Sequence, residues 1–340
     1  MEKVILGRTN LCVNKNGFGA LPVQRRTMED AKAILRHAYE NGINFFDTAR
    51  AYSDSEEKIG YALSDVRKNI VIATKTMAKD VAGFWQDLET SLKNLKTDHV
   101  DIYQFHNPPF CPKPGDGSGL YEAMLQARAE GKIRFIGITN HSRDIAFEAL
   151  RSGLYDTLQF PFSYLSSEED IALVKEAGER NVGFICMKAM SGGLITNARQ
   201  AYAFMVQYKN ALPIWGVQKM EELDEFLECE VDDAALDVDF IEREKKTLSG
   251  DFCRGCGYCL PCPVSIPINN AARMSLLLRR SPSAQWLSQD WREKMARIDE
   301  CIGCRHCAMH CPYHLDTPNL LRKNLADYRE FAAKWDEEHQ

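Results

Sequence analysis

MEDAKAILRHAYENGINFFDTARAY (residues 28–52) joins a helix-type pattern directly to a strand-type pattern, and this junction decides the fold. Four apolar residues within residues 28–42 follow the 3.6-residue period of an amphipathic helix: Ala31, Ile34, Leu35 and Ala38. Thr27 is suited to cap the start of this helix, and Gly42 is suited to stop it. The next residues, INFF (43–46), form a short β-type run. The stretch therefore predicts one helix followed at once by one strand.

The same alternation continues on both sides of this stretch, over residues 16–229. Seven more β-type runs are separated by helical patterns: GFGA (17–20), IVIAT (70–74), VDIYQF (100–105), RFIGIT (134–139), DTLQF (156–160), VGFICM (182–187) and ALPIWG (211–216). With INFF they make eight strand–helix units, the number that closes a (β/α)8 TIM barrel. The regularity also fits a doubly wound parallel sheet, which stays an alternative. We expect residues 1–15 to form a short hairpin before the first strand.

The bulk composition is that of an ordinary globular protein. Hydrophobic residues make up 45% of the 340 residues, and charged residues make up 26%. The formal net charge of −6 shows no basic excess, so we do not expect a nucleic-acid partner. The opening residues, MEKVILGRTN, lack the apolar core of a signal peptide, and no later stretch reads as a membrane span. We therefore expect a cytoplasmic location without membrane contact.

The twelve cysteines are distributed unevenly along the chain. Eight fall within residues 253–311, and the other four are scattered: Cys12, Cys111, Cys186 and Cys229. Because a reducing cytoplasm disfavours disulfides, such a cluster indicates metal binding. We predict a barrel domain over residues 1–230, an acidic helical connector over residues 231–250, and a metal-binding domain over residues 251–340.

Several predicted strands end in a polar residue, and the C-terminal strand ends of a TIM barrel form its functional mouth. These residues are Asp47 after INFF, Lys75 after IVIAT, His106 after DIYQF and Asn140 after FIGIT. Tyr52 lies five residues beyond Asp47, in a loop that can fold over the same opening. Each residue taken alone is explained by a strand that emerges into water. Together they predict a reactive site.

These residue types suit the protonation of an oxygen while hydride reaches the adjoining carbon. Tyrosine is a poor acid at neutral pH, and a neighbouring ammonium group lowers its pKa and eases proton donation. We expect Lys75 to act in this way on Tyr52, with Asp47 keeping Lys75 charged and oriented. A neutral His106 is expected to hydrogen-bond the substrate oxygen and hold it against Tyr52.

Four separated motifs closely resemble the aldo-keto reductase family: NGINFFDTARAYSDSEEKIGYAL (41–63), VIATKT (71–76), DIYQFHNP (101–108) and GKIRFIGITNHS (131–142). LGRTNLCVNKNGFGA (6–20) matches as well, and the resemblance covers residues 4–228. It implies a (β/α)8 barrel and NAD(P)H-dependent reduction of a small carbonyl substrate, or oxidation of the alcohol. The family's catalytic tetrad falls on Asp47, Tyr52, Lys75 and His106, with Tyr52 as the proton donor.

The resemblance also implies a set of cofactor contacts. Asp47 is counted among them, Thr139, Asn140 and Gln159 are expected at the nicotinamide carboxamide, and Ser191, Gly192 and Gly193 are expected at the phosphates. Met187 stands where the family usually has a tyrosine that stacks on the nicotinamide. Methionine also packs against a ring face, although less rigidly.

The choice between NAD and NADP is expected to depend on the stretch PIWGVQKMEELDEFLE (213–228). Members of the family that prefer NADP carry basic residues here, whereas this chain has Glu221, Glu222 and Glu225 with Lys219 as the basic residue. Carboxylates repel a 2′-phosphate, and Glu222 is a candidate to accept hydrogen bonds from ribose hydroxyls. This pattern slightly favours NAD over NADP.

CIGCRHCAMHCP (301–312) has the C-x2-C-x2-C-x3-C-P spacing by which bacterial ferredoxins bind [4Fe–4S] clusters. Structural zinc is the alternative, although zinc sites usually show separated C-x2-C pairs. CRGCGYCLPCP (253–263) is one residue shorter before its last cysteine, Cys262. The remaining residues read as helices, so the tail resembles an α-helical ferredoxin domain with two [4Fe–4S] clusters. Ligation that crosses between the runs groups Cys253, Cys256, Cys259 and Cys311 on one cluster, and Cys262, Cys301, Cys304 and Cys307 on the other.

The two predicted chemistries do not couple directly, because NAD(P)H delivers two electrons as hydride and each cluster accepts one. No flavin-binding fingerprint is visible that would split the pair. We predict a reductase whose clusters exchange electrons with a ferredoxin or flavoprotein partner. Two alternatives stay open: a reductase with structural or oxygen-sensing clusters, and an electron-transfer or interaction subunit whose barrel is a docking module. Oxygen-labile clusters suggest an anaerobic host.

Overall fold

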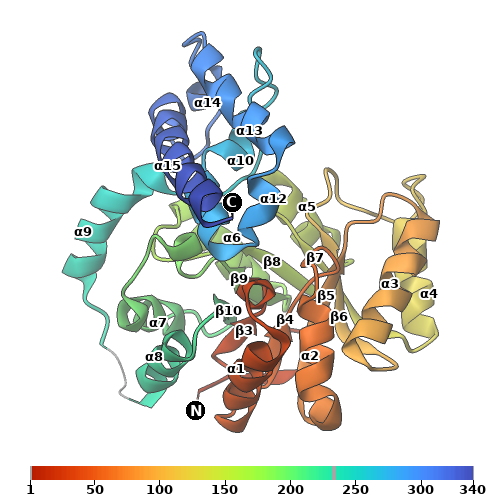
Figure 1. Ribbon diagram of the computed structural model, residues 1–340. Coiled ribbons are helices and arrows are strands. Elements are labelled where there is room, and N and C mark those ends of the chain that lie inside the picture. The colour runs from red at the N-terminus through yellow and green to blue at the C-terminus, as the bar shows by residue number, and fades with distance from the viewer. Residues whose placement is uncertain (1, 232–234, 340) are drawn as a thin grey trace. The chain divides into compact units, whose positions relative to one another are not determined.

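A computed structural model describes residues 2–231 and 235–339 of the chain (Figure 1). These residues form two compact units, which we call the barrel unit and the cysteine unit. The chain passes from the first to the second between Asp237 and Val238. Ser191–Ile195 is the exception, because this short segment belongs to the cysteine unit. Residues 232–234 of the predicted connector lie outside the described residues.

The barrel unit is built on eight parallel strands that close into a barrel. The strands are β3 (Gly17–Gly19), β4 (Phe45–Asp47), β5 (Val71–Thr76), β6 (Val100–His106), β7 (Ile133–Thr139), β8 (Thr157–Pro161), β9 (Gly183–Met187) and β10 (Ala211–Gly216). β10 pairs with both β9 and β3, which closes the sheet. The predicted TIM barrel is therefore confirmed, and the doubly wound alternative is wrong.

The strands alternate with eight helices in the order that the sequence predicts (Figure 1). The helices are α1 (Met28–Glu40), α2 (Ser55–Leu63), α3 (Val81–Leu95), α4 (Leu120–Ala129), α5 (Arg143–Ser152), α6 (Glu168–Glu179), α7 (Ala198–Val206) and α8 (Met220–Val231). The start of α1 is capped by Thr27, whose side chain accepts a hydrogen bond from the backbone N–H of Asp30. The α1 residues predicted to be apolar and inward-facing are all buried.

A two-stranded antiparallel hairpin precedes the barrel, as predicted. Its strands are β1 (Lys3–Ile5) and β2 (Cys12–Asn14). Val4 and Val13 pack in one buried cluster with Phe45 and Val71, the first residues of β4 and β5. Because these residues lie at the N-terminal strand ends, the hairpin fills that end of the barrel and leaves the C-terminal ends for the site.

The strand register brings the polar residues that end the strands to the same mouth. Lys75 of β5 is paired with Gln104 of β6. His106 of β6 is paired with Thr139 of β7, which is in turn paired with Gln159 of β8. Parallel strands present their carboxyl ends on one side, so the register gathers side chains that are far apart in the sequence.

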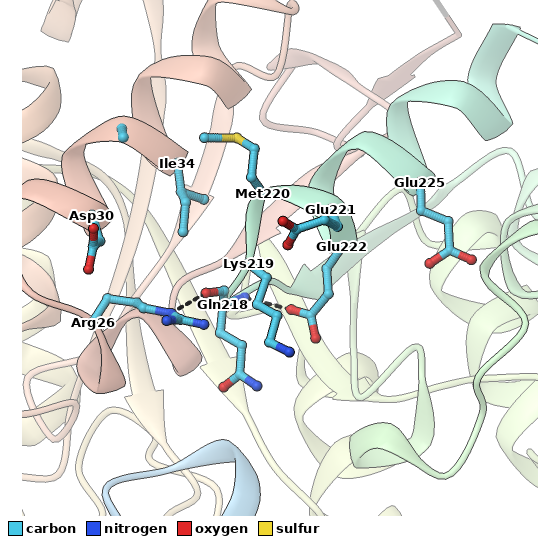
Figure 2. Close-up of a pocket in the computed structure, with 10 residues that line it drawn as sticks. Arg26, Asp30, Ile34, Gln218, Lys219, Met220, Glu221, Glu222 and Glu225 are labelled. Carbon is cyan, nitrogen blue, oxygen red and sulfur yellow. Dashed lines mark hydrogen bonds between the residues drawn. The ribbon is translucent and has the colours of Figure 1, made fainter.

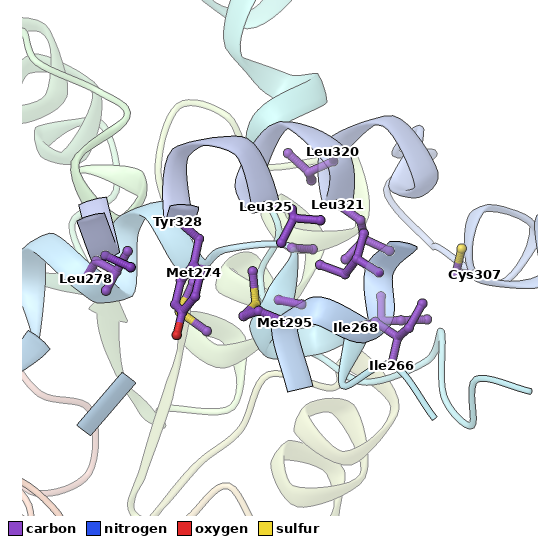
Figure 3. Packing of buried hydrophobic residues seen from close by; sticks show 14 of the residues in the cluster. Ile266, Ile268, Met274, Leu278, Met295, Cys307, Leu320, Leu321, Leu325 and Tyr328 are labelled. Carbon is purple, nitrogen blue, oxygen red and sulfur yellow. The ribbon is translucent and has the colours of Figure 1, made fainter. Parts of the chain in front are cut away.

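The cysteine unit contains helices and no strand among residues 238–339. Its helices are α9 (Val238–Leu248), α10 (Ile268–Ala271), α11 (Met274–Arg280), α12 (Ser283–Trp286), α13 (Gln289–Ala296), α14 (His306–Met309) and α15 (Thr317–Glu338). Figure 3 shows its buried core, in which Met274, Leu278 and Met295 pack with Leu321 of α15. In the described parts of both units, no helix is long and apolar enough to cross a bilayer.

Candidate active site

A buried ion pair lies at the centre of the barrel mouth. The Lys75 Nζ is 2.6 Å from the Asp47 Oδ1, and it also donates a hydrogen bond of 2.6 Å to the backbone carbonyl of Thr48. Burial raises the pKa of Asp47 and lowers the pKa of Lys75, and in each case the attraction of the partner opposes the effect of burial. The pair thus depends on both members, because removal of one leaves a buried charge, which typically costs about 3–5 kcal/mol.

Tyr52 and His106 lie beside this ion pair. The Lys75 ammonium is 5.2 Å from the centroid of the Tyr52 ring. The Tyr52 and His106 rings meet edge to face, with centroids 5.7 Å apart and an interplanar angle of 82°. The structure therefore brings all four predicted catalytic residues to one place, although they come from separate strands and from the loop after β4.

His106 is a neutral imidazole at the pH of the cell. Burial, followed by the nearby Lys75 ammonium, lowers the pKa of His106 from 6.5 to about 3. Its Nδ1 is buried and has no hydrogen-bond partner among the residues that the structure describes. A buried polar nitrogen without a partner is costly, so this atom marks a place where the site has hydrogen-bonding capacity to spare.

The depressed pKa of His106 predicts a pH-dependent stability. Between pH 3 and pH 6.5 the unfolded chain protonates this histidine and the folded chain does not, so protons favour unfolding. The free energy of unfolding is expected to fall with decreasing pH in this window, by up to about 1.4 kcal/mol per pH unit. Denaturant unfolding at several pH values, compared between wild type and His106→Asn, measures this slope. Equal slopes in the two proteins would contradict the assignment of a neutral buried His106.

Gln104 is a site residue that the sequence reasoning missed. Its Nε2 donates a hydrogen bond of 3.0 Å to the Gln159 Oε1, and it lies 3.4 Å from the Asp47 Oδ2. Gln104 is fully buried, and within residues 2–231 and 235–339 its own Oε1 has no hydrogen-bond partner. The available signal was a glutamine inside the apolar run VDIYQF, two residues before His106 and hence on the same face of the strand.

The residues predicted to contact nicotinamide lie next to one another. The Thr139 hydroxyl is 3.8 Å from the Met187 sulfur. The Asn140 backbone N–H donates to the Gln159 carbonyl, and its side-chain amide donates to the Pro108 carbonyl at 2.9 Å. These bonds hold Asn140 in a fixed orientation at the ends of β7 and β8.

The stretch predicted to decide between NAD and NADP lines a cavity of about 800 Å³ between α1 and α8 (Figure 2). Arg26, which the sequence reasoning did not consider, also lines this cavity, and its guanidinium donates to the Gln218 carbonyl. The Glu222 Oε2 accepts a hydrogen bond of 2.8 Å from the backbone N–H of Gln218, two residues before α8. The cavity therefore contains Arg26 and Lys219 beside four carboxylates: Asp30, Glu221, Glu222 and Glu225.

The loop predicted to contact the cofactor phosphates has an unusual backbone. Ser191, Gly192 and Gly193 all have positive φ angles, of 50°, 76° and 106°. The Ser191 side chain is buried, and the three residues belong to the cysteine unit.

The eight clustered cysteines line two separate hollows in the cysteine unit. One hollow is lined by Cys253, Cys256, Cys259 and Cys311. The other is lined by Cys262, Cys301, Cys304 and Cys307. Each hollow thus receives three cysteines from one run and one from the other run, so Cys262 reaches the second hollow despite the shortened spacing.

The donor set of each hollow is that of an iron–sulfur cluster. Four cysteines line each hollow, and four cysteine thiolates are the usual ligands of a [4Fe–4S] cluster.

Comparison with known proteins agrees with both parts of the chain. Residues 15–201 match the aldo/keto reductase family, and residues 252–316 match a 4Fe-4S dicluster domain. The chain is 31% identical over 216 residues to L-galactose dehydrogenase from Arabidopsis thaliana, a match that covers 58% of this chain and 67% of that protein. It is 25% identical over 229 residues to the NADH-specific methylglyoxal reductase of Escherichia coli, with coverage of 58% and 69%.

A solved aldo-keto reductase from Bacillus halodurans, in its holo form, superposes with a TM-score of 0.63 at 20% identity. The superposition covers 73% of this chain and 96% of that one, and at this identity it supports the fold alone. The family match spans more than half of the sequence and includes the motifs that bear Asp47, Tyr52, Lys75 and His106. The chain therefore belongs to the aldo-keto reductase family and is an oxidoreductase that carries a 4Fe-4S dicluster domain after its barrel.

Proposed function

We propose that the chain is an NAD(P)H-dependent reductase of a small aldehyde or ketone, or a dehydrogenase of the alcohol, with Tyr52 as the proton donor. The observation that carries this proposal is the buried Lys75–Asp47 ion pair against the Tyr52 ring, with His106 edge-on to the same ring. This set combines an acid, a charge that stabilises its conjugate base and a neutral hydrogen-bonding group.

The protein residues have distinct roles in this reaction. When bound, the nicotinamide supplies a hydride, which carries two electrons to the carbonyl carbon. Tyr52 donates one proton to the carbonyl oxygen, so the product is the alcohol. The Lys75 ammonium stabilises the phenolate that remains on Tyr52, and Asp47 holds Lys75 in place. His106, being neutral, hydrogen-bonds the substrate oxygen without competing for the proton.

The mouth of the barrel fits a nicotinamide group. Two buried polar atoms, the Gln104 Oε1 and the His106 Nδ1, have no hydrogen-bond partner in the described part of the chain and leave hydrogen-bonding capacity there. We propose that Asp47, Thr139, Asn140 and Gln159 contact the nicotinamide ribose and carboxamide, that Met187 packs on the ring, and that Ser191, Gly192 and Gly193 contact the phosphates.

We propose NAD as the slightly favoured cofactor over NADP. The cavity between α1 and α8 is lined by four carboxylates and only two basic side chains, and this excess of negative charge would repel the 2′-phosphate of NADP. We propose that one of these carboxylates, Glu222, accepts hydrogen bonds from the ribose hydroxyls. The sequence alone indicated one basic residue here, Lys219. Arg26 adds a second positive charge to the cavity, so the preference for NAD is weak. One relative is named as NADH-specific, which agrees with this choice.

We propose that the eight clustered cysteines bind two [4Fe–4S] clusters with crossed ligation. Cys253, Cys256, Cys259 and Cys311 would hold one cluster, and Cys262, Cys301, Cys304 and Cys307 would hold the other. Each cluster supplies one-electron chemistry, which hydride transfer does not use. A ferredoxin or flavoprotein partner would therefore exchange electrons with the cysteine unit, in the cytoplasm of an anaerobic host.

A structural role of the clusters is the second candidate. Cys307 is part of the buried core of the cysteine unit, and Cys253, Cys259, Cys262, Cys301 and Cys311 pack against it. Clusters bound there would hold the core together. The third interpretation, a docking module, gains no support from the barrel, because docking requires neither a buried ion pair nor a tyrosine beside it.

Assays on anaerobically purified protein test the proposed function. We expect oxidation of NADH or NADPH that depends on an aldehyde or ketone from a panel of small carbonyl compounds, and about eight irons per chain. EPR spectra after dithionite reduction should show the clusters, whereas NADH alone should not reduce them. A protein that oxidises neither nucleotide with any carbonyl of the panel, or whose clusters bleach with NADH and no partner, would contradict the proposal.

A further inference from the structure

The turn that carries Tyr52, between β4 and α2, is bounded by two ion pairs with the first residues of α2. Two residues before Tyr52, the Arg50 Nη1 lies 2.6 Å from the Glu56 Oε2. Two residues after Tyr52, the Asp54 carboxylate lies 2.9 Å from the Lys58 Nζ. Tyr52 is therefore flanked on each side by a charged residue that is fixed to the helix.

Both partners on α2 are buried, although they are charged. Glu56 is fully buried and Lys58 is 2% exposed, whereas Arg50 and Asp54 reach the surface. A buried charge is costly even when it is paired, and well-packed apolar side chains in its place often give equal or greater stability. Stability alone therefore does not account for two such charges beside one turn. Their position on either side of Tyr52 points to the geometry of that turn.

Glu56 also connects the turn to the strand that carries Lys75. Its Oε1 accepts a hydrogen bond of 2.7 Å from the hydroxyl of Thr74, the residue directly before Lys75 in β5. The Arg50 backbone N–H donates to the Lys75 carbonyl at 3.0 Å. The buried carboxylate of Glu56 thus lies where it can set the distance between Tyr52 and Lys75.

Lys58 connects the other end of the turn to the loop after β3. In addition to its contact with Asp54, its Nζ donates to the Val23 carbonyl at 3.0 Å. The Ser53 hydroxyl donates to the Gln24 Oε1 of the same loop at 2.8 Å. The turn is therefore held on one side by β5 and on the other side by the loop after β3.

We propose that Glu56 and Lys58 are positioning residues for the proton donor, which hold the Tyr52 hydroxyl at the distance from the Lys75 ammonium that proton transfer requires. The inference rests on the proposed function, in which Tyr52 donates the proton. Neither residue is among the proposed contacts of the nucleotide. Because a misplacement of about 1 Å can lower a rate about 10²-fold, loss of either ion pair should lower kcat and leave nucleotide binding unchanged.

The test is a double-mutant cycle in steady-state carbonyl reduction by the anaerobic holoprotein. Glu56→Gln keeps the shape of the side chain and removes its charge. We expect kcat to fall about ten- to a hundred-fold, with KM and the dissociation constant of the preferred nucleotide within about three-fold of wild type. In the Tyr52→Phe background the same substitution should lower kcat less than about two-fold, because no proton donor is left to position. A general loss of stability would lower kcat equally in both backgrounds.

Asp101→Asn is the matched control. Asp101 is likewise a buried carboxylate with arginine partners, since its two oxygens lie 2.8 Å from the Arg67 Nη2 and 2.5 Å from the Arg134 Nη1. It stands near the N-terminal end of β6, at the end of the barrel away from the site. We expect this variant to lower the melting temperature and to change kcat less than about two-fold.

Asp54→Asn tests the second ion pair. The Asp54 side chain is 44% exposed, so this variant should fold even if Glu56→Gln does not, and it then decides the proposal. We expect kcat to fall about three- to ten-fold in the wild-type background and less than about two-fold in Tyr52→Phe.

The outcomes separate this inference from the function on which it rests. Suppose that Tyr52→Phe loses activity, but that either variant of the ion pairs is as fast as wild type or loses as much kcat in both backgrounds. The positioning role is then refuted, and the proposed function stands. If wild type reduces no carbonyl, or if Tyr52→Phe is as active as wild type, the proposed function and this inference both fail.

Discussion

Replacing Tyr52 by phenylalanine is expected to lower the rate of carbonyl reduction by about 10²- to 10⁴-fold, the usual contribution of a positioned proton donor. The substitution removes the phenolic O–H and keeps the ring. The edge-to-face contact with His106 and the approach of the Lys75 ammonium to the ring can therefore persist. The predicted loss is then chemical and not a consequence of altered packing.

The size of the effect follows from the lack of a second proton donor beside the half-buried Tyr52. In Tyr52→Phe the developing alkoxide has no acid beside it, and the Lys75 ammonium is already engaged with Asp47 and the Thr48 carbonyl. His106 cannot replace the donor, because its pKa of about 3 leaves it without a readily released proton at neutral pH. The reaction would depend on water for the proton.

Steady-state rates with the best carbonyl substrate measure the loss of activity in Tyr52→Phe. Fluorescence titration with NADH measures whether the variant still binds the nucleotide. Nucleotide affinity should stay within about two-fold of wild type, since Tyr52 is not among the proposed cofactor contacts. Tyr61→Phe is the matched control, because its hydroxyl contacts Glu29 at the surface and lies outside the site. A Tyr52→Phe protein with activity within ten-fold of wild type would remove Tyr52 from its proposed role.

The barrel could be predicted because local sequence and global fold agree in this part of the chain. β5 is buried along its whole length, and its first half, VIA (71–73), is a continuous apolar run. Polar residues at or next to the strand ends stand out against such runs, and Asp47, Lys75 and His106 are among them. Spacing along the sequence was enough to place these residues, since all eight strands point the same way.

Residues whose importance depends on long-range packing escaped the sequence reasoning. Gln104 looks like an ordinary strand residue until the register places it beside Gln159 and Asp47. Arg26 lies almost 200 residues from Gln218, and only the closure of the barrel between β10 and β3 brings them together. No local pattern indicates that Ser191 packs with a domain that begins nearly 50 residues later.

In the cysteine tail, too, the sequence predicted one feature, the type of cluster, and left another, the place of Cys262, undecided. The spacing of the second run predicted [4Fe–4S] chemistry, because three closely spaced thiols and a distant fourth match known ligand geometry. The shortened first run did not show where Cys262 would lie. The structure places Cys262 in the hollow of the second run, and Cys311 in the hollow of the first.

Crossed ligation predicts that an alanine variant of one ligand cysteine loses one whole cluster and keeps the other. Wild type is expected to hold about eight irons, and Cys262→Ala about four, since one cluster loses a ligand and the other keeps all of its own. Alanine is preferred to serine because it supplies no oxygen that could replace the thiolate. Cys12→Ala, at an exposed position in the barrel unit, is the control and should keep all of the iron.

Double variants decide which cysteines share a cluster. Cys262 and Cys304 line one hollow, so removing both should cost no more iron than removing either, and about four irons should remain. Cys259 lines the other hollow, so Cys259→Ala combined with Cys262→Ala should remove nearly all of the iron. Ligation within each run predicts the reverse, because Cys259 and Cys262 would then share a cluster. Iron and sulfide counts on anaerobically purified variants, with EPR of the reduced proteins, separate the two patterns, and the reverse pattern would refute the crossed arrangement.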